Sequence, residues 1–240
     1  MGNGNSLPER LDNARKTGTF TLTDARLKEP PAEVLTLQKL RNLDLSRNRI
    51  EALPPAIGRL SSLRIVALAH NALETLPREL LSLASLETLN VSHNPITSLP
   101  ADGFRSLAAL KTLDLSGCRL RELPDDMASL PRIVTLLLRD NRLRSLPPAL
   151  AALRTLEELD VSSNQISEIP DTFSGLAAIK TLRLASNQIQ KFPADMLKRT
   201  GLVWLELDNN PFGEPQLRDC AGYDDFVKRR KNRADQFLKV

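Results

Sequence analysis

Two histidines are the residues of this chain whose type and spacing come nearest to a metal site. His70 and His93 lie 23 residues apart, and each directly precedes an asparagine. If a backbone unit of that length repeats, the two side chains fall on neighbouring strands, about 5 Å apart. Zinc takes four ligands, however, and the corresponding positions on either side hold Arg47 and Gly117. We therefore expect a pair of surface histidines that contacts a partner, with zinc binding as the alternative.

Catalytic motifs of other kinds do not occur in the sequence. There is neither a G-x-x-x-x-G-K-[ST] phosphate loop nor a G-x-S-x-G nucleophile motif, and neither Cys118 nor Cys220 has a histidine nearby in sequence. We therefore predict a protein that is not an enzyme, binds no metal and requires no cofactor. Two cysteines do not make a disulfide framework, which favours the reducing cytoplasm or nucleus, and we expect no Cys118–Cys220 bond.

The composition limits the class of partner. Among 240 residues, 33 are basic and 29 are acidic, which gives a net charge of +4. This mixed charge is unlike the dense positive field of a dedicated nucleic-acid-binding protein, so we expect a protein partner instead of nucleic acid. No apolar run reaches the roughly 18 residues of a membrane-spanning helix, and the first 20 residues do not have the pattern of a secretory signal.

The first residues nevertheless carry a lipidation pattern. The opening MGNGNS fits M-G-x-x-x-[ST], the pattern for N-myristoylation at Gly2. One myristoyl chain gives only reversible membrane attachment, and the nearby basic residues Arg10, Arg15 and Lys16 add attraction to an anionic lipid surface. We expect a cytoplasmic protein that attaches peripherally to a membrane; an ordinary, unmodified start is the alternative.

A unit of 23 residues recurs along most of the chain in the form L-x-x-L-x-L-x-x-[NC]-x-L, followed by a proline. One step, from Asn94 to Cys118, has 24 residues, and the extra residue falls within ADGF, after the proline. A degenerate first copy begins near Phe20. The ladder positions are Asn48, Asn71, Asn94, Cys118, Asn141, Asn164, Asn187 and Asn210.

This frame resembles the leucine-rich repeat, in the L-P-x-x-I/L-x-x-L subclass found in cytoplasmic signalling proteins, from residue 17 to residue 212. The resemblance implies an α/β fold: a right-handed leucine-rich-repeat solenoid (horseshoe) with a parallel concave sheet and helical N- and C-terminal caps. We assign 1–16 to the lipidation signal and N-terminal cap helix, and 17–212 to about nine coils, of which the first and last are degenerate. Residues 213–240 form a C-terminal cap helix with a basic tail.

The outward strand positions are the place where binding is expected. In L-x-x-L-x-L the strand points Leu43 and Leu45 inward and Asp44 outward, so the outward residues are not needed for the core. Acidic residues recur among them, with a few apolar and basic ones between. We predict that a monomer binds its protein partner through Asp44, Ile65, His70, His93, Asp114, Leu137, Arg139, Glu158, Asp160, Arg183, Trp204 and Glu206.

The two ends of the chain carry a closer resemblance and also an alternative function. Met-Gly-Asn at the start, KTGTFTLTDARL after the first helix, and GYDDF with a basic tail resemble a small eukaryotic member of the family. That resemblance implies a lipid-anchored cytoplasmic scaffold without chemistry of its own. The run KRRKNR at 228–233 is also compatible with phosphate contacts or nuclear import. A nuclear or ribonucleoprotein-associated module that uses this helix is therefore the alternative function.

Overall fold

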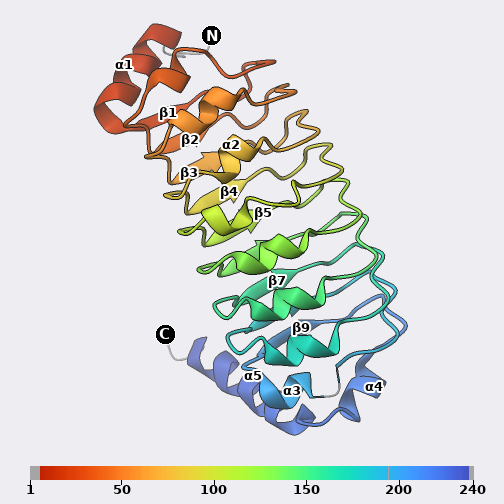
Figure 1. Cartoon of the computed structure of the whole chain (residues 1–240). Coiled ribbons are helices and arrows are strands. Elements are labelled where there is room, and N and C mark those ends of the chain that lie inside the picture. The colour runs from red at the N-terminus through yellow and green to blue at the C-terminus, as the bar shows by residue number, and fades with distance from the viewer. Residues whose placement is uncertain (1–5, 194, 238–240) are drawn as a thin grey trace.

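The computed structural model describes residues 6–193 and 195–237, and the repeating coils form one curved stack (Figure 1). Across these residues, nine three-residue strands form a single parallel sheet in chain order. Each residue pairs with its equivalent in the next coil, as Leu43 does with Val66. The predicted solenoid with its parallel concave sheet is confirmed. The strands are β1 (Thr19–Thr21), β2 (Asn42–Asp44), β3 (Ile65–Ala67), β4 (Thr88–Asn90), β5 (Thr112–Asp114), β6 (Thr135–Leu137), β7 (Glu158–Asp160), β8 (Thr181–Arg183) and β9 (Trp204–Glu206).

The outer side of each coil is a short helical segment that usually follows the repeated proline. Pro54, Pro124 and Pro170 each precede such a segment, because proline fixes φ and lacks an N–H at a corner where no sheet hydrogen bond is made. The segments are η1 (Val34–Thr36), η2 (Pro55–Arg59), α2 (Arg78–Leu81), η3 (Phe104–Ser106), η4 (Asp125–Ser129), η5 (Pro148–Ala152), η6 (Asp171–Gly175) and α3 (Met196–Arg199).

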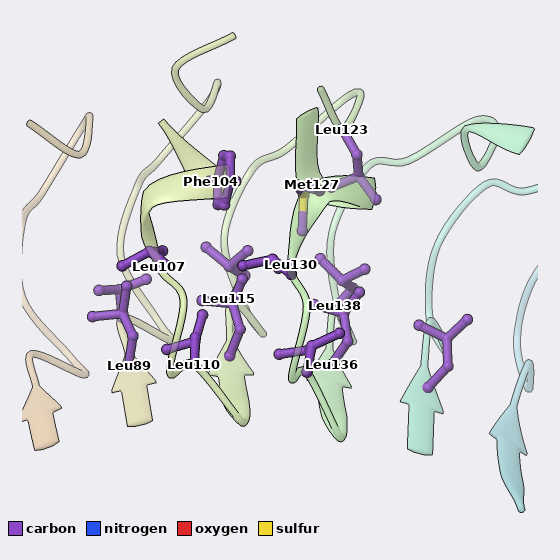
Figure 2. Packing of buried hydrophobic residues seen from close by; sticks show 14 of the residues in the cluster. Leu89, Phe104, Leu107, Leu110, Leu115, Leu123, Met127, Leu130, Leu136 and Leu138 are labelled. Atoms are coloured by element: carbon purple, nitrogen blue, oxygen red, sulfur yellow. The ribbon is translucent and has the colours of Figure 1, made fainter. Parts of the chain in front are cut away.

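The core lies between the strands and these outer segments. Figure 2 shows Phe104 and Met127, from η3 and η4, above strand-side leucines such as Leu115 and Leu138. All four side chains are at most 1% exposed. Because each coil supplies only a few of these residues, a coil cannot bury its own leucines and depends on the coils at both sides.

The asparagine ladder joins consecutive coils through buried hydrogen bonds. In Asn94, Nδ2 donates to the carbonyl oxygens of Leu68 and Val91, both at 2.9 Å, and Oδ1 accepts from the N–H of Leu73 at 3.0 Å. The same pattern recurs at Asn141, where Oδ1 accepts from the N–H of Leu120. One amide therefore satisfies backbone groups of its own turn and of the preceding coil.

Cys118 is the exception in the ladder. Its Sγ contacts the carbonyl oxygen of Val91 at 3.6 Å, but the thiol offers no strong acceptor for the N–H of Ile96, which has no hydrogen-bond partner among the described residues. Replacing Cys118 by asparagine should supply that acceptor and stabilise the protein by about 1 kcal/mol. Urea unfolding followed by circular dichroism measures the difference. A destabilised Cys118→Asn variant would show that the site is too small for an amide.

The stability of the protein at alkaline pH should depend on the same thiol. Burial raises the pKa of the Cys118 thiol to about 11, well above its ordinary value. The folded protein then holds a proton that the unfolded chain releases, so the free energy of unfolding should fall as the pH rises from about 9 to about 11. The fall should be shallower in Cys118→Asn. Parallel urea-unfolding profiles of the two proteins over this range would contradict the assignment.

Helices cover both ends of the stack, as predicted. At the start, α1 (Leu7–Thr17) begins in a capping box, in which the carboxylate of Glu9 accepts the N–H of Ser6 at 2.8 Å. Leu11 and Ala14 on this helix are buried. At the finish, α4 (Glu214–Arg218) and α5 (Tyr223–Phe237) follow the last coil, and α5 lies beneath α3 (Figure 1).

Candidate functional site

The strand face, meaning the outward side chains of β2–β9 with the two residues that follow each strand, is the candidate site. In most strands the middle residue is buried while the first and third are partly exposed. Ile65 and Trp204 are the large apolar residues of this face with the most exposure, at 43% and 44%. Exposed apolar side chains on a surface that the core does not use are typical of contact sites.

Three of the predicted aspartates turn out to stabilise the ends of their strands. Oδ1 of Asp44, Asp114 and Asp160 accepts the N–H of the serine two residues later, at 2.9 to 3.0 Å. In Asp160 it also accepts the serine hydroxyl, and only 8% of this residue is exposed. Asp160 thus belongs to the strand end more than to the open surface. The recurring D-x-S spacing was the sequence signal for this local motif.

Charged residues gather on β7, β8 and β9. Arg183 lies between Glu158 and Glu206: Nη1 contacts Oε1 of Glu158, and Nε lies 3.5 Å from Oε1 of Glu206. The hydrogen bond to Glu158 raises the pKa of Arg183, so its guanidinium stays charged. Oε1 of Glu206 also accepts the indole N–H of Trp204 at 2.6 Å. Four of the predicted residues therefore form one connected group.

Part of the basic run of α5 makes contacts within the molecule, which its sequence did not predict. Arg229 donates from Nε to the carbonyl oxygen of Leu202 at 3.0 Å and from Nη2 to that of Leu197 at 2.6 Å. Arg230 places its guanidinium 5.5 Å from the ring centroid of Trp204. These two arginines join α5 to the last coil, and their helical spacing from the buried Phe226 was the only sequence signal.

The two histidines stack at the edge of the strand face. Their ring centroids are 4.3 Å apart with 7° between the planes. Both have φ near +55°, as does the residue before every ladder asparagine, and Gly117, which precedes Cys118, has φ of +64°. A Cβ on Gly117 would lie 2.4 Å from Nδ1 of His93, so this glycine makes room for the ring. Within residues 6–193 and 195–237, no three His, Cys, Asp or Glu side chains are grouped to hold a metal ion.

The remaining predicted residues extend along the face. Leu137 on β6 is half-buried and pairs in register with Asp114 on one side and Asp160 on the other. Arg139, two residues later, is exposed. Ile65 lies three strands earlier, on β3. The predicted set is thus a long surface with one connected group at its C-terminal end. Gly2 lies outside the described residues.

The molecule is an open solenoid in which one repeated coil builds both the core and a continuous outer face of a parallel sheet. The sequence pattern described as "Leucine rich repeat" matches residues 38–96, 85–143, 131–189 and 154–212. The chain belongs to the leucine-rich repeat family. Domains of this family commonly mediate protein–protein interactions. Comparison with curated proteins gave no match.

Solved structures agree with this assignment. A leucine-rich-repeat protein of Leptospira interrogans superposes with a TM-score of 0.67 at 30% identity, over 82% of this chain and 57% of that chain. The ectodomain of the receptor kinase GASSHO1/SCHENGEN3 from Arabidopsis thaliana, solved with CASPARIAN STRIP INTEGRITY FACTOR 2, gives 0.71 at 28%, over 80% and 24%. A chain of the octameric complex of Latrophilin 3, Unc5D and FLRT2 gives 0.73 at 26%, over 81% and 61%.

This chain spans less than two thirds of each of these three chains. In the part of the chain that the structure describes, no helix combines the length and the apolar character needed to cross a bilayer.

Proposed function

We propose that this protein is a non-enzymatic scaffold that binds a protein partner on its strand face. The exposure of Ile65 and Trp204 on that face carries the proposal, since a solvated strand surface has no need of large apolar side chains. The half-buried Leu137 and the exposed Arg139 lie between them along the sheet. The receptor ectodomain is solved in complex with CASPARIAN STRIP INTEGRITY FACTOR 2, and FLRT2 with Latrophilin 3 and Unc5D; this supports the same use of the fold here.

The finer proposal concerns location. We place the protein in the cytoplasm, attached reversibly to a membrane by a myristoyl group on Gly2. The lipidation pattern supports this, as do the L-P-x-x-I/L-x-x-L subclass and the resemblance of both ends to leucine-rich repeat-containing protein 57. The alternative of a nuclear or ribonucleoprotein module is less favoured, because Arg229 and Arg230 are engaged in the end cap and fewer basic groups remain for phosphate.

Proximity labelling in eukaryotic cells tests the partner proposal. The wild type is compared with an Ile65→Ala/Leu137→Ala variant and with Val227→Ala, which removes an equally exposed apolar side chain from α5, outside the strand face. We expect the labelling of the partner to fall about tenfold in the double variant, because one or two interface anchors are lost. Its labelling should be unchanged in Val227→Ala. Identical labelling by all three proteins would contradict binding on this face.

The location has its own test. Intact mass spectrometry of protein from eukaryotic cells should show one myristoyl group in the wild type and none in Gly2→Ala, which should also lose its membrane fraction. An unmodified glycine in the wild type would reject lipidation. Loss of a nuclear fraction when 228–233 is neutralised would instead support the alternative.

A further inference from the structure

The C-terminal end of the sheet is less completely covered than its interior. The inward leucines of the preceding strands, Leu159 and Leu182, are fully buried, whereas their equivalent in β9, Leu205, is partly exposed. Leu207, the next inward residue, is 9% exposed, while Leu184 in the coil before it is fully buried. The reason is that β9 pairs only with β8 among the described strands. The closing helix α5 packs against α3 and reaches the last coil through Arg229 and Arg230.

The backbone of β9 also has an open edge. Directly after β8, the N–H of Leu184 donates to the carbonyl oxygen of Glu206 in β9. The equivalent N–H of Leu207 has no following strand to bind and has no hydrogen-bond partner among the described residues. An unpaired strand edge accepts an extended segment of another chain through main-chain hydrogen bonds.

A cavity of about 330 Å³ lies beside this edge. It is bounded by β9 and the residues after it, by α4 and by one residue of α5. Leu205 and Leu217 line it with apolar surface. Its charged lining residues are Glu206, Asp208, Glu214 and Arg230.

One carboxylate that lines the cavity is left without a partner. Glu206 already contacts Arg183, and Glu214 accepts the Tyr223 hydroxyl at 2.6 Å and lies 3.6 Å from Arg218. The carboxylate of Asp208 has no hydrogen bond or ion pair within the described part of the chain. Arg183 and Arg218 thus balance two of the three carboxylates, and Asp208 is the carboxylate that an added positive side chain could pair with.

Arg230 indicates where such a side chain would lie. Along the sheet, the first residues of neighbouring strands form a column, as Thr181 and Trp204 do. Neighbouring strands are about 4.8 Å apart. The guanidinium of Arg230 lies 5.5 Å from the indole ring, on α5 and not on a strand. A first side chain on an added strand would approach the same indole ring, because it would follow Trp204 in that column.

We propose that this end of the sheet binds an extended segment of the protein partner that carries an arginine. The segment pairs with the open edge of β9, and its arginine replaces Arg230 over Trp204, beside Glu206 and Asp208. Arg230 is then a built-in competitor that holds the indole ring until the partner displaces it. This inference rests on the proposed function, since it assigns a chemistry to the partner.

The single tryptophan of the chain makes the site directly observable. The probe is a capped heptapeptide of alternating threonine and valine with one central arginine, and its control carries glutamine instead. Titration into the full-length protein should change the fluorescence of Trp204 saturably with the arginine peptide. The affinity of the glutamine peptide should be lower by a factor of about three or more, because it lacks the cation–π contact and the ion pair. Equal binding of the two peptides would overturn the proposal.

Variants of α5 test the competition. Arg230→Ala should strengthen binding of the arginine peptide about threefold, because the competing guanidinium is gone. Lys231→Ala removes the same charge from the next, exposed position and should leave the affinity unchanged. Glu206→Gln, which does not alter the helix, should weaken binding. Unchanged affinity in both Arg230→Ala and Glu206→Gln would overturn the proposal.

Failure of the arginine site can be distinguished from failure of the proposed function, because the double variant of the labelling experiment replaces only Ile65 and Leu137. Loss of labelling in that double variant without peptide binding would reject the arginine site and leave the protein-binding face in place. Peptide binding without any labelling difference would support the site and reject the broader face.

Discussion

Replacing Phe104 by alanine is expected to lower the free energy of unfolding by about 4 kcal/mol. The phenyl ring is 1% exposed and points from η3 toward the strand leucines (Figure 2). Coils lie on both sides of it, and the N–H of Phe104 is held by Oδ2 of Asp126 in the next coil at 2.8 Å. The backbone therefore has little freedom to move inward and fill the space left by the ring.

Urea unfolding followed by circular dichroism measures this change. Phe104→Leu is the matched control, because it keeps most of the apolar volume and should cost about 1 kcal/mol. A loss below about 1 kcal/mol in Phe104→Ala would show that the outer segment collapses onto the core. A transition that splits into two steps would show that the coils on either side unfold separately.

Replacing Asn94 by alanine should cost about 3 kcal/mol, the second of the two largest effects. The residue is 2% exposed, and its amide satisfies Leu68, Val91 and Ser92 through Nδ2 and Leu73 through Oδ1. Truncation leaves the buried N–H of Leu73 without a partner. The carbonyl oxygens of Leu68, Val91 and Ser92 each lose one of two donors and keep those from Asn71, Cys118 and His70. Because no water can easily reach them, their desolvation is not recovered.

The control for this prediction is Gln165→Ala. Gln165 directly follows a ladder asparagine and is exposed. Its hydrogen bond to the Leu143 carbonyl comes from the backbone N–H, which the substitution keeps. We expect a change of at most about 0.5 kcal/mol. Equal effects of the two substitutions in urea unfolding would show that the ladder amide contributes no more than a surface amide.

The repeat frame predicted the fold because leucine spacing directly determines which strand residues face inward. Val66 and Leu89 fall in register as the 23-residue step requires. The sequence predicted Asp44 and Asp114 only as partner contacts. Their side chains face the open side of the sheet, but they also accept backbone hydrogen bonds at the ends of their strands. That use depends on the serine two residues on, which the leucine frame does not include.

Contacts between segments distant in sequence were the part that the sequence alone did not reveal. The run 228–233 indicates a positively charged helix, but which arginine reaches the carbonyl of Leu202 and which covers Trp204 depends on the angle at which α5 meets the last coil. Likewise, the histidine spacing predicted proximity, whereas the stacking depends on the space beside Gly117. The predicted contacts of the strand face with a partner stay a prediction.

The longer coil between Asn94 and Cys118 shows where this architecture tolerates change. Its extra residue is accommodated before η3, where Gly103 has φ of +117°, and Leu89 still pairs with Leu113 across β4 and β5. Length variation at the outer rim thus leaves the inner sheet in register. Such a rim gives evolution, or a protein engineer, a position for grafting new loops without disturbing the recognition surface opposite.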